Sequence, residues 1–211
     1  MFFKKDKIWL SAIFAAIAQA FKSPGILLLA AYGILAIKDL IENKKLNLVI
    51  KKYFPFVLVP ITVILIFYLY YLQTGNFWAY FQSGDNFHLN PLPYLVFIST
   101  KSWINTIWLE DVVYIFFLAI YGVYKLVKKY KFDITSVYPL VFLIATLLVA
   151  HRDISRYISP IYPFLLLSYQ KQLNQKSIKT VLILLIPAII LYAINFICGN
   201  TAPISDWTNY L

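Results

Sequence analysis

The chain has 211 residues, of which 61% are hydrophobic and 13% charged, and its mean hydropathy is +0.72. Soluble domains are nearer half apolar and a quarter charged, so this composition excludes a soluble globular protein and predicts an integral membrane protein. The net charge of +10 does not indicate a nucleic-acid-binding protein, because the basic residues are dispersed between apolar stretches. The single cysteine, Cys198, excludes an internal disulfide and a cysteine-built metal site.

Seven apolar segments predict an all-α, polytopic transmembrane helix bundle that forms one integral-membrane domain over residues 1–211. They are residues 8–21, 25–37, 53–72, 112–127, 134–150, 157–169 and 180–197. Several are short, since a helix needs about 20 residues to cross an apolar core of about 30 Å. We expect a tight hairpin of short helices at the start, a possible kink at Pro60, and an irregular sixth segment because of Pro160 and Pro163.

The first segment allows a second interpretation. Three lysines precede it and Ala18-Gln19-Ala20 lies near its end, which is also the pattern of a secretory signal peptide with a cleavage site. A further apolar segment follows directly, where a secreted domain would be expected, and we therefore favour a membrane helix.

The longest connection covers residues 73–109 and is rich in aromatic side chains. Phe77, Trp78, Tyr80 and Phe81 suit a helix that lies in the membrane interface.

Positive charge predicts the orientation of the segments. Alternating the seven segments across the membrane places 15 of the 19 basic residues on one side, which the positive-inside rule assigns to the cytoplasm. The N-terminus is then cytoplasmic, and we expect a prokaryotic plasma membrane. The basic residues on the extracytoplasmic side are Lys22, Lys101, Arg152 and Arg156.

The turn at residues 151–163, HRDISRYISPIYP, contains the chain's two arginines, Arg152 and Arg156. An arginine fork binds phosphate in a bidentate manner and keeps its charge, so these residues are candidates for binding a lipid phosphate, together with Lys22 and His151. Because the flanking segments are short, the turn should lie in a polar recess below the outer surface. The alternative is an ion pair between Asp153 and an arginine.

Asp85 and His88, three residues apart in the outer loop, are candidates for contact with a sugar or an acceptor. For Asp85 we favour the alternative, a turn residue in Ser83-Gly84-Asp85-Asn86. Glu110 and Asp111 open a predicted helix, where capping and the helix dipole explain them. No spacing of His, Asp and Glu residues predicts a metal site, and no cofactor is expected.

Three stretches resemble the C-type membrane glycosyltransferases (GT-C). WLSAIFAAIAQAFKSPGILLL is similar to a segment in which small residues precede a basic residue, Pro-Gly and leucines, with an arginine usual at the position of Lys22. YFQSGDNFHLNPLPY resembles an outer loop of the GPI-mannosyltransferase-like branch. HRDISRYISPIYPFLLL resembles the Arg-Tyr, Pro, Tyr-Pro segment near the last helices of such enzymes.

The resemblance implies the C-terminal half of a mannosyltransferase-like enzyme of the dolichyl-phosphate-mannose type. Its donor would be a polyprenyl-phosphate-linked sugar in a membrane lipid environment, used on the extracytoplasmic face. In the family the acidic catalytic motif lies upstream of the matching segments, so no catalytic residue is assigned here, and a missing N-terminal half or a partner subunit is expected. The alternatives are a non-catalytic membrane subunit that binds a partner protein, and a small transporter.

Overall fold

The structure is a computed structural model of the chain, and it describes residues 2–82, 92, 107–149 and 154–199. The secondary structure of these residues is helical, with no β-sheet among them. The chain divides into two compact units, Met1–Ser168 and Tyr169–Leu211.

The first unit begins with a helical hairpin. A short 3-10 turn, η1 (Phe3–Lys5), leads into α1 (Ile8–Phe21), and a second 3-10 turn, η2 (Ser23–Gly25), leads into α2 (Ile26–Asn43). A Cβ atom on Gly25 would lie 2.5 Å from the backbone nitrogen and the Cα of Gln19, so only glycine lets this turn approach α1 so closely. The hairpin was expected from the sequence, although α2 extends beyond the predicted end at residue 37.

The third predicted segment is longer than expected and contains a break. It consists of α3 (Leu46–Tyr53), the 3-10 helix η3 (Phe54–Val57) and α4 (Leu58–Thr74). Pro55 lies in the first turn of η3, where its missing N–H would have no helical partner in any case. Pro60 lies in the first turn of α4, so the interruption occurs at Pro55, before the proline that was expected to cause a kink.

The aromatic residues after α4 fold back against it. A short helix, α5 (Ala79–Gln82), packs on α4, and the ring of Phe67 contacts those of Phe77 and Phe81 at centroid distances of 5.4 Å and 5.1 Å. A helix was predicted in this stretch, and its position in a membrane interface remains a prediction.

The second half of the first unit is built on α6 (Ile107–Tyr130), which packs against α7 (Ile134–Leu147) and α9 (Tyr162–Ser168). The predicted sixth segment is irregular, as expected. It is divided into the 3-10 helix η6 (Ser159–Ile161), which contains Pro160, and α9, which has Pro163 in its first turn, and neither proline can donate a backbone hydrogen bond. The short helix α8 (Ile154–Tyr157) precedes this segment and shares only Tyr157 with it.

Small side chains bring the helices of the first unit together. Ala12 and Ala15 of α1 are buried, and α1 packs closely on α4. Tyr32 of α2 stacks on Phe56 with ring centroids 3.8 Å apart, and its hydroxyl forms a 2.8 Å hydrogen bond with the hydroxyl of Ser11. The buried cluster therefore combines aromatic packing with a satisfied polar pair.

The second unit contains α10 (Gln170–Leu173) and a long helix, α11 (Lys176–Gly199). The predicted segment at residues 180–197 is confirmed as a helix, and its described side chains are all exposed. Leu184, for example, is 73% exposed. A helix that is apolar all round requires an apolar environment, which a bilayer supplies.

Three helical stretches of the described residues are long and apolar enough to cross a membrane: Ser23–Asn43, Leu46–Thr74 and Lys176–Asn195. Three apolar helices are shorter: Ile8–Phe21, Ile134–Leu147 and Ser159–Ser168. These lengths indicate an integral membrane protein, as the composition predicted. The full count of seven membrane segments remains a prediction.

Candidate functional site

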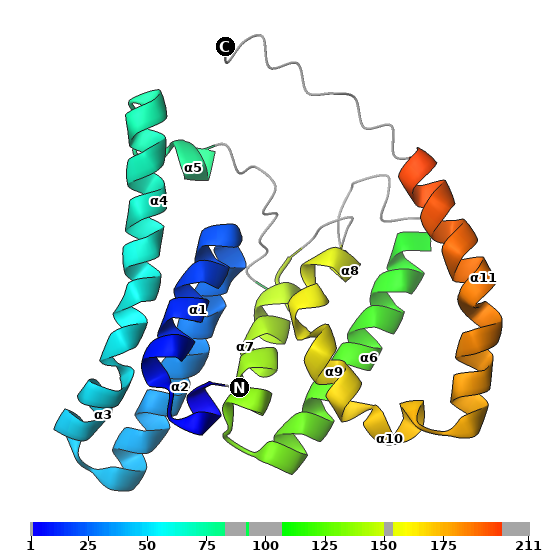
Figure 1. The fold of residues 1–211 in the computed structure, drawn as a ribbon, viewed down its shortest axis with the longest axis horizontal. Helices are drawn as coiled ribbons and strands as arrows, with labels where there is room; N and C mark the ends of the chain where they lie inside the picture. Colours follow the sequence, from blue (N-terminus) through cyan, green and yellow to red (C-terminus); the bar gives the residue numbers. More distant parts are fainter. Residues whose placement is uncertain (1, 83–91, 93–106, 150–153, 200–211) are drawn as a thin grey trace. The chain divides into compact units, whose positions relative to one another are not determined.

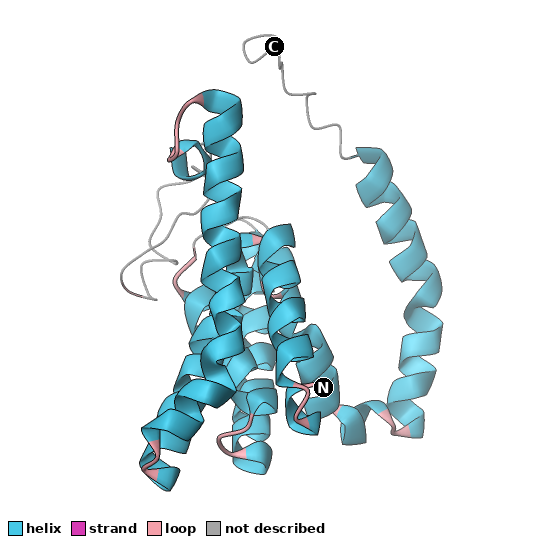
Figure 2. Cartoon of the chain, turned by 60° about the vertical axis from the view of Figure 1, so that its left-hand side comes forward, coloured by secondary structure: helices cyan, strands magenta, loops and turns pink. Residues whose placement is uncertain are grey.

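The two ends of the first unit differ in their polar side chains. The end that contains α3 and the α6–α7 turn is rich in lysine. Figure 1 shows α3 and the α6–α7 turn at one end of this unit, with α5 and α8 toward the other. Figure 2 shows the same helices from another side.

Side-chain contacts join three lysine-bearing segments at this end. The Nζ of Lys4 lies 3.1 Å from Oδ1 of Asp133, and the Nζ of Lys38 donates to the carbonyl oxygen of Phe132 at 3.3 Å. Lys52 forms a 2.8 Å ion pair with Asp39. The N-terminal segment, the α2–α3 region and the α6–α7 turn therefore meet at the same end of the unit, which we call the lysine-rich end.

Asp133 stabilises this end in two ways: it caps the start of α7, and it forms the ion pair with Lys4. Its carboxylate accepts a hydrogen bond from the backbone N–H of Thr135 at 2.9 Å and, with Ser136, forms a capping box at the start of α7. Partial burial acts to raise the pKa of the Asp133 carboxyl. The hydrogen bonds from Thr135 and Lys4 outweigh that effect and hold the pKa below its ordinary value of 3.8.

At the other end, the α1–α2 turn meets α8. The Nζ of Lys22, just after α1, lies 5.2 Å from the ring centroid of Tyr157, which is the distance of a cation–π interaction. Arg156 is the residue before Tyr157 and is exposed. Lys22 and Arg156, both predicted to bind phosphate, are 134 positions apart in the chain. The contact between Lys22 and Tyr157 shows that the elements carrying these two cations are neighbours.

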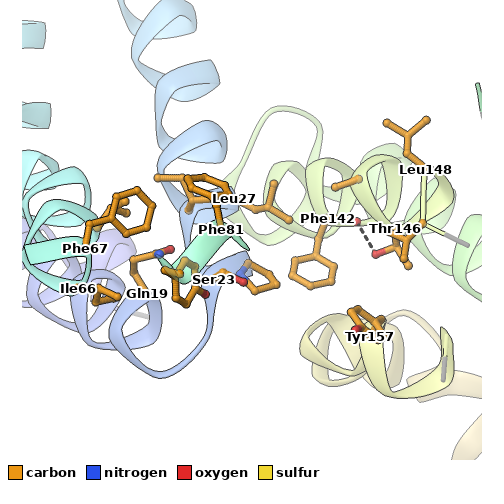
Figure 3. Close-up of a pocket in the computed structure, with 16 residues that line it drawn as sticks. Gln19, Ser23, Leu27, Ile66, Phe67, Phe81, Phe142, Thr146, Leu148 and Tyr157 are labelled. Atoms are coloured by element: carbon orange, nitrogen blue, oxygen red, sulfur yellow. Dashed lines mark hydrogen bonds between the residues drawn. The ribbon is translucent and has the colours of Figure 1, made fainter. Parts of the chain in front are cut away.

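A cavity of about 660 Å³ lies beside this contact, within the first unit. It is lined by segments of α1, η2, α2, α4, α5, α7 and α8 (Figure 3). No lining residue is charged, and most are apolar. The lining consists of Gln19, Ser23, Pro24, Ile26, Leu27, Val63, Ile66, Phe67, Tyr80, Phe81, Phe142, Ala145, Thr146, Leu148, Val149 and Tyr157.

Gln19 is the unusual residue of this lining. It is only 5% exposed, and its Oε1 atom has no hydrogen-bond partner among the residues that the structure describes. The hydroxyl of Thr146, which is also buried, donates to the carbonyl oxygen of Phe142 at 2.9 Å. Because a buried polar group without a partner costs free energy, the side chain of Gln19 marks a place where a ligand would be stabilised.

Only some of the predicted site residues can be placed. Lys22 and Arg156 are both among the described residues, and Lys22 lies over the ring of Tyr157, the residue after Arg156, while their role in binding a phosphate remains a prediction. Asp85, His88, His151, Arg152 and Asp153 lie outside the described residues, so the predicted sugar contact and the alternative ion pair remain predictions.

Neither this apolar cavity nor a role for Gln19 was predicted from the sequence, in which Gln19 is part of a possible cleavage site. A lone amide in the apolar run of residues 8–21 was the available signal. Across the described ranges there is no group of three His, Cys, Asp or Glu residues that could hold a metal ion.

Comparison with known proteins adds no relative. No protein-family model, curated protein or solved structure matches this chain. The resemblance to GT-C glycosyltransferases therefore stays a prediction from the quoted residues.

Proposed function

We propose that the chain is a membrane-embedded module of a mannosyltransferase-like glycosyltransferase that binds a polyprenyl-phosphate-linked sugar. The observation that carries this proposal is the contact between Lys22 and Tyr157, which brings the basic residue of the α1–α2 turn to the element that bears Arg156. An apolar cavity is lined by Ser23 and Tyr157, the residues that follow these two cations in the chain. An apolar surface next to a fixed positive charge suits a lipid with an anionic headgroup.

The chemistry of such a transfer requires cations at the phosphate that leaves with the polyprenyl chain. A cation held in place is more effective than a mobile one, because no free energy is spent on orienting it during the reaction. The ring of Tyr157 would restrict the position of Lys22 in this manner. Arg156 would add a bidentate fork, and His151 and Arg152 belong to the same proposed set.

The proposed topology has seven membrane segments, a cytoplasmic N-terminus and an extracytoplasmic binding face. The meeting of three lysine-bearing segments at one end of the first unit supports it, since the positive-inside rule requires these segments to lie on the same side of the membrane. Lys22 and Arg156 would then lie on the opposite, extracytoplasmic side, where a lipid-linked donor would be bound.

A second candidate, a non-catalytic subunit that binds a partner protein, is favoured by the location of the paired carboxylates. Asp39, Glu42 and Asp133 form ion pairs with lysines at the lysine-rich end, away from Lys22 and Arg156. A transferase needs a general base near the acceptor hydroxyl, a contribution of about 10²–10⁴ in rate. In the GT-C family that the chain resembles, the acidic catalytic motif lies upstream of the matching segments. From that resemblance we propose that a separate N-terminal half or partner subunit supplies the base, and that the chain alone shows no turnover.

The test compares two variants that each remove one positive charge. Lys22→Gln acts at the proposed phosphate site, and Lys51→Gln acts on an exposed lysine of α3 at the other end. Binding of a polyprenyl phosphate to the purified protein in nanodiscs should weaken about tenfold for Lys22→Gln, the loss of one charge-assisted hydrogen bond. Lys51→Gln should bind as the unmodified protein does.

Arg156→Lys separates phosphate recognition from simple attraction of charge. It keeps the charge but loses the planar fork, so bidentate binding predicts a weaker complex. Equal affinity of the unmodified protein, Lys22→Gln and Arg156→Lys would contradict the proposed function. Turnover by the 211-residue chain alone would contradict the need for a second component.

A further inference from the structure

We propose that the cavity beside Gln19 binds a neutral lipid alcohol, with one apolar chain along the lining and a hydroxyl that donates a hydrogen bond to Oε1 of Gln19. This ligand is distinct from the phosphate proposed above, and the inference does not depend on that function. The phosphate would be held by Lys22 and Arg156, neither of which lines the cavity.

The lining determines the apolar part of the ligand. Phe67, Phe81 and Phe142 contribute aromatic surface, and aliphatic side chains supply most of the rest. The volume of about 660 Å³ lies within the range of about 300–1,000 Å³ that is usual for small-molecule sites. Burying an apolar chain against such a surface is favourable in proportion to the area removed from water.

Gln19 determines the polar part of the ligand. Its buried Oε1 can accept a hydrogen bond and has no donor among the described residues, so a ligand that brings a donor supplies what the protein lacks. The donor should be uncharged, because the lining has no carboxylate to pair with an ammonium group.

A fluorescent reporter is already present next to the cavity. The ring of Trp78 lies 6.1 Å from that of Phe67 and 6.0 Å from that of Phe81, and both phenylalanines line the cavity. A brominated chain in the cavity would lie close to this indole and quench its fluorescence. Replacing Trp9, Trp103, Trp108 and Trp207 with phenylalanine leaves Trp78 as the single reporter.

The experiment compares two probes on this single-tryptophan protein in nanodiscs. One probe is a dibrominated stearyl alcohol, and the other is its methyl ether, which has the same chain but no hydrogen to donate. We expect the alcohol to reach half-maximal quenching at a mole fraction about fivefold lower than the ether, the effect of one neutral hydrogen bond. Equal potency of the two probes in the unmodified cavity would overturn the proposal.

Two substitutions assign the preference to a residue. Gln19→Met keeps a side chain of similar length without an acceptor amide, and it should make the two probes equally potent. Gln170→Met makes the same chemical change at an exposed position of the second unit and should keep the preference for the alcohol. A preference that persists in Gln19→Met would overturn the assignment, and if this variant does not fold, the two probes on the unmodified cavity decide alone.

A third variant separates this inference from the proposed function. Lys22→Gln should keep the preference for the alcohol while it loses affinity for polyprenyl phosphate. Failure of the phosphate experiment therefore leaves the alcohol site intact, and failure of the alcohol experiment leaves the phosphate site intact.

Discussion

The polar side chains at the two ends of the first unit differ in how they are paired. At the lysine-rich end, Lys4 and Lys52 are each paired with a carboxylate: Lys4 joins the N-terminal segment to the α6–α7 turn, and Lys52 joins α3 to α2. At the other end, Lys22 lies over an aromatic ring, and Gln19 is buried without a partner among the described residues. Paired charges in water stabilise little but fix orientation, whereas an unsatisfied buried group is costly and is explained by a ligand.

The largest expected effect concerns the sides of the membrane on which the two ends lie. With Cys198 replaced by serine, a cysteine at Ser155 in α8 should react with an impermeant thiol reagent from outside intact cells. A cysteine at Lys128 in α6 should not react until the membrane is permeabilised. Mass-shift labelling measures both, and labelling of Lys128→Cys alone would invert the topology and remove the basis for an extracytoplasmic donor.

The next effect concerns the turn that places Lys22. Gly25→Ala should lower stability by about 1–3 kcal/mol, because the new Cβ would lie 2.5 Å from backbone atoms of Gln19 and force α1 and η2 apart. Gly33→Ala is the matched control in α2, where a Cβ would meet nothing within 4 Å. It should be neutral or stabilising by about 0.5–1 kcal/mol. Thermal unfolding in detergent measures the difference. Equal unfolding temperatures of Gly25→Ala and Gly33→Ala would show that the η2 turn can move away from α1 without loss of stability.

The smallest effect is a pH dependence at the lysine-rich end. Asp133→Asn keeps a good N-cap residue for α7 but removes the ion pair with Lys4, so at neutral pH it should cost less than about 1 kcal/mol. The pKa of Asp133 is lowered in the folded state, so the carboxylate stabilises the fold above its ordinary pKa of 3.8.

That stabilisation is lost as the pH falls through the lower folded-state pKa. The difference in unfolding temperature between Asp133→Asn and the unmodified protein should therefore begin to shrink as the pH falls below about 4, and it should disappear only below the lowered folded-state pKa of Asp133. A difference that is constant down to strongly acidic pH would show that the ion pair is not its source. Asp133→Ala should be less stable than Asp133→Asn at every pH, because it also loses the cap.

The sequence predicted the helices well because their signals are local. Apolar runs located α1, α4 and α11, and Pro160 and Pro163 predicted that the sixth segment is irregular, which its division into η6 and α9 confirms. Helix ends were less well predicted. The second predicted segment ended at residue 37, because charged residues follow it, yet α2 continues to Asn43, and Asp39 in this extension is stabilised by Lys52 and by the hydroxyl of Tyr53.

The site was only partly predictable, for a physical reason. Charge alternation along the chain indicates that Lys22 and Arg156 lie on one side, but their shared neighbour Tyr157 depends on how helices pack. The cavity depends on packing entirely, since its lining comes from seven elements spread over the first unit. A buried amide such as Gln19 has no periodic pattern that would set it apart from one that faces water.

The short helices of the first unit have a consequence for the surrounding lipid. α1 and α7 have 14 residues each, which corresponds to a length of about 21 Å. Under the proposed topology these helices are shorter than a hydrocarbon layer of about 30 Å, so the bilayer must thin around them, at a cost for each ångström of mismatch. The protein should therefore be most stable in membranes of shorter-chain lipids. A thinner bilayer around it would also shorten the distance between the bilayer centre and either membrane surface for a group attached to a lipid.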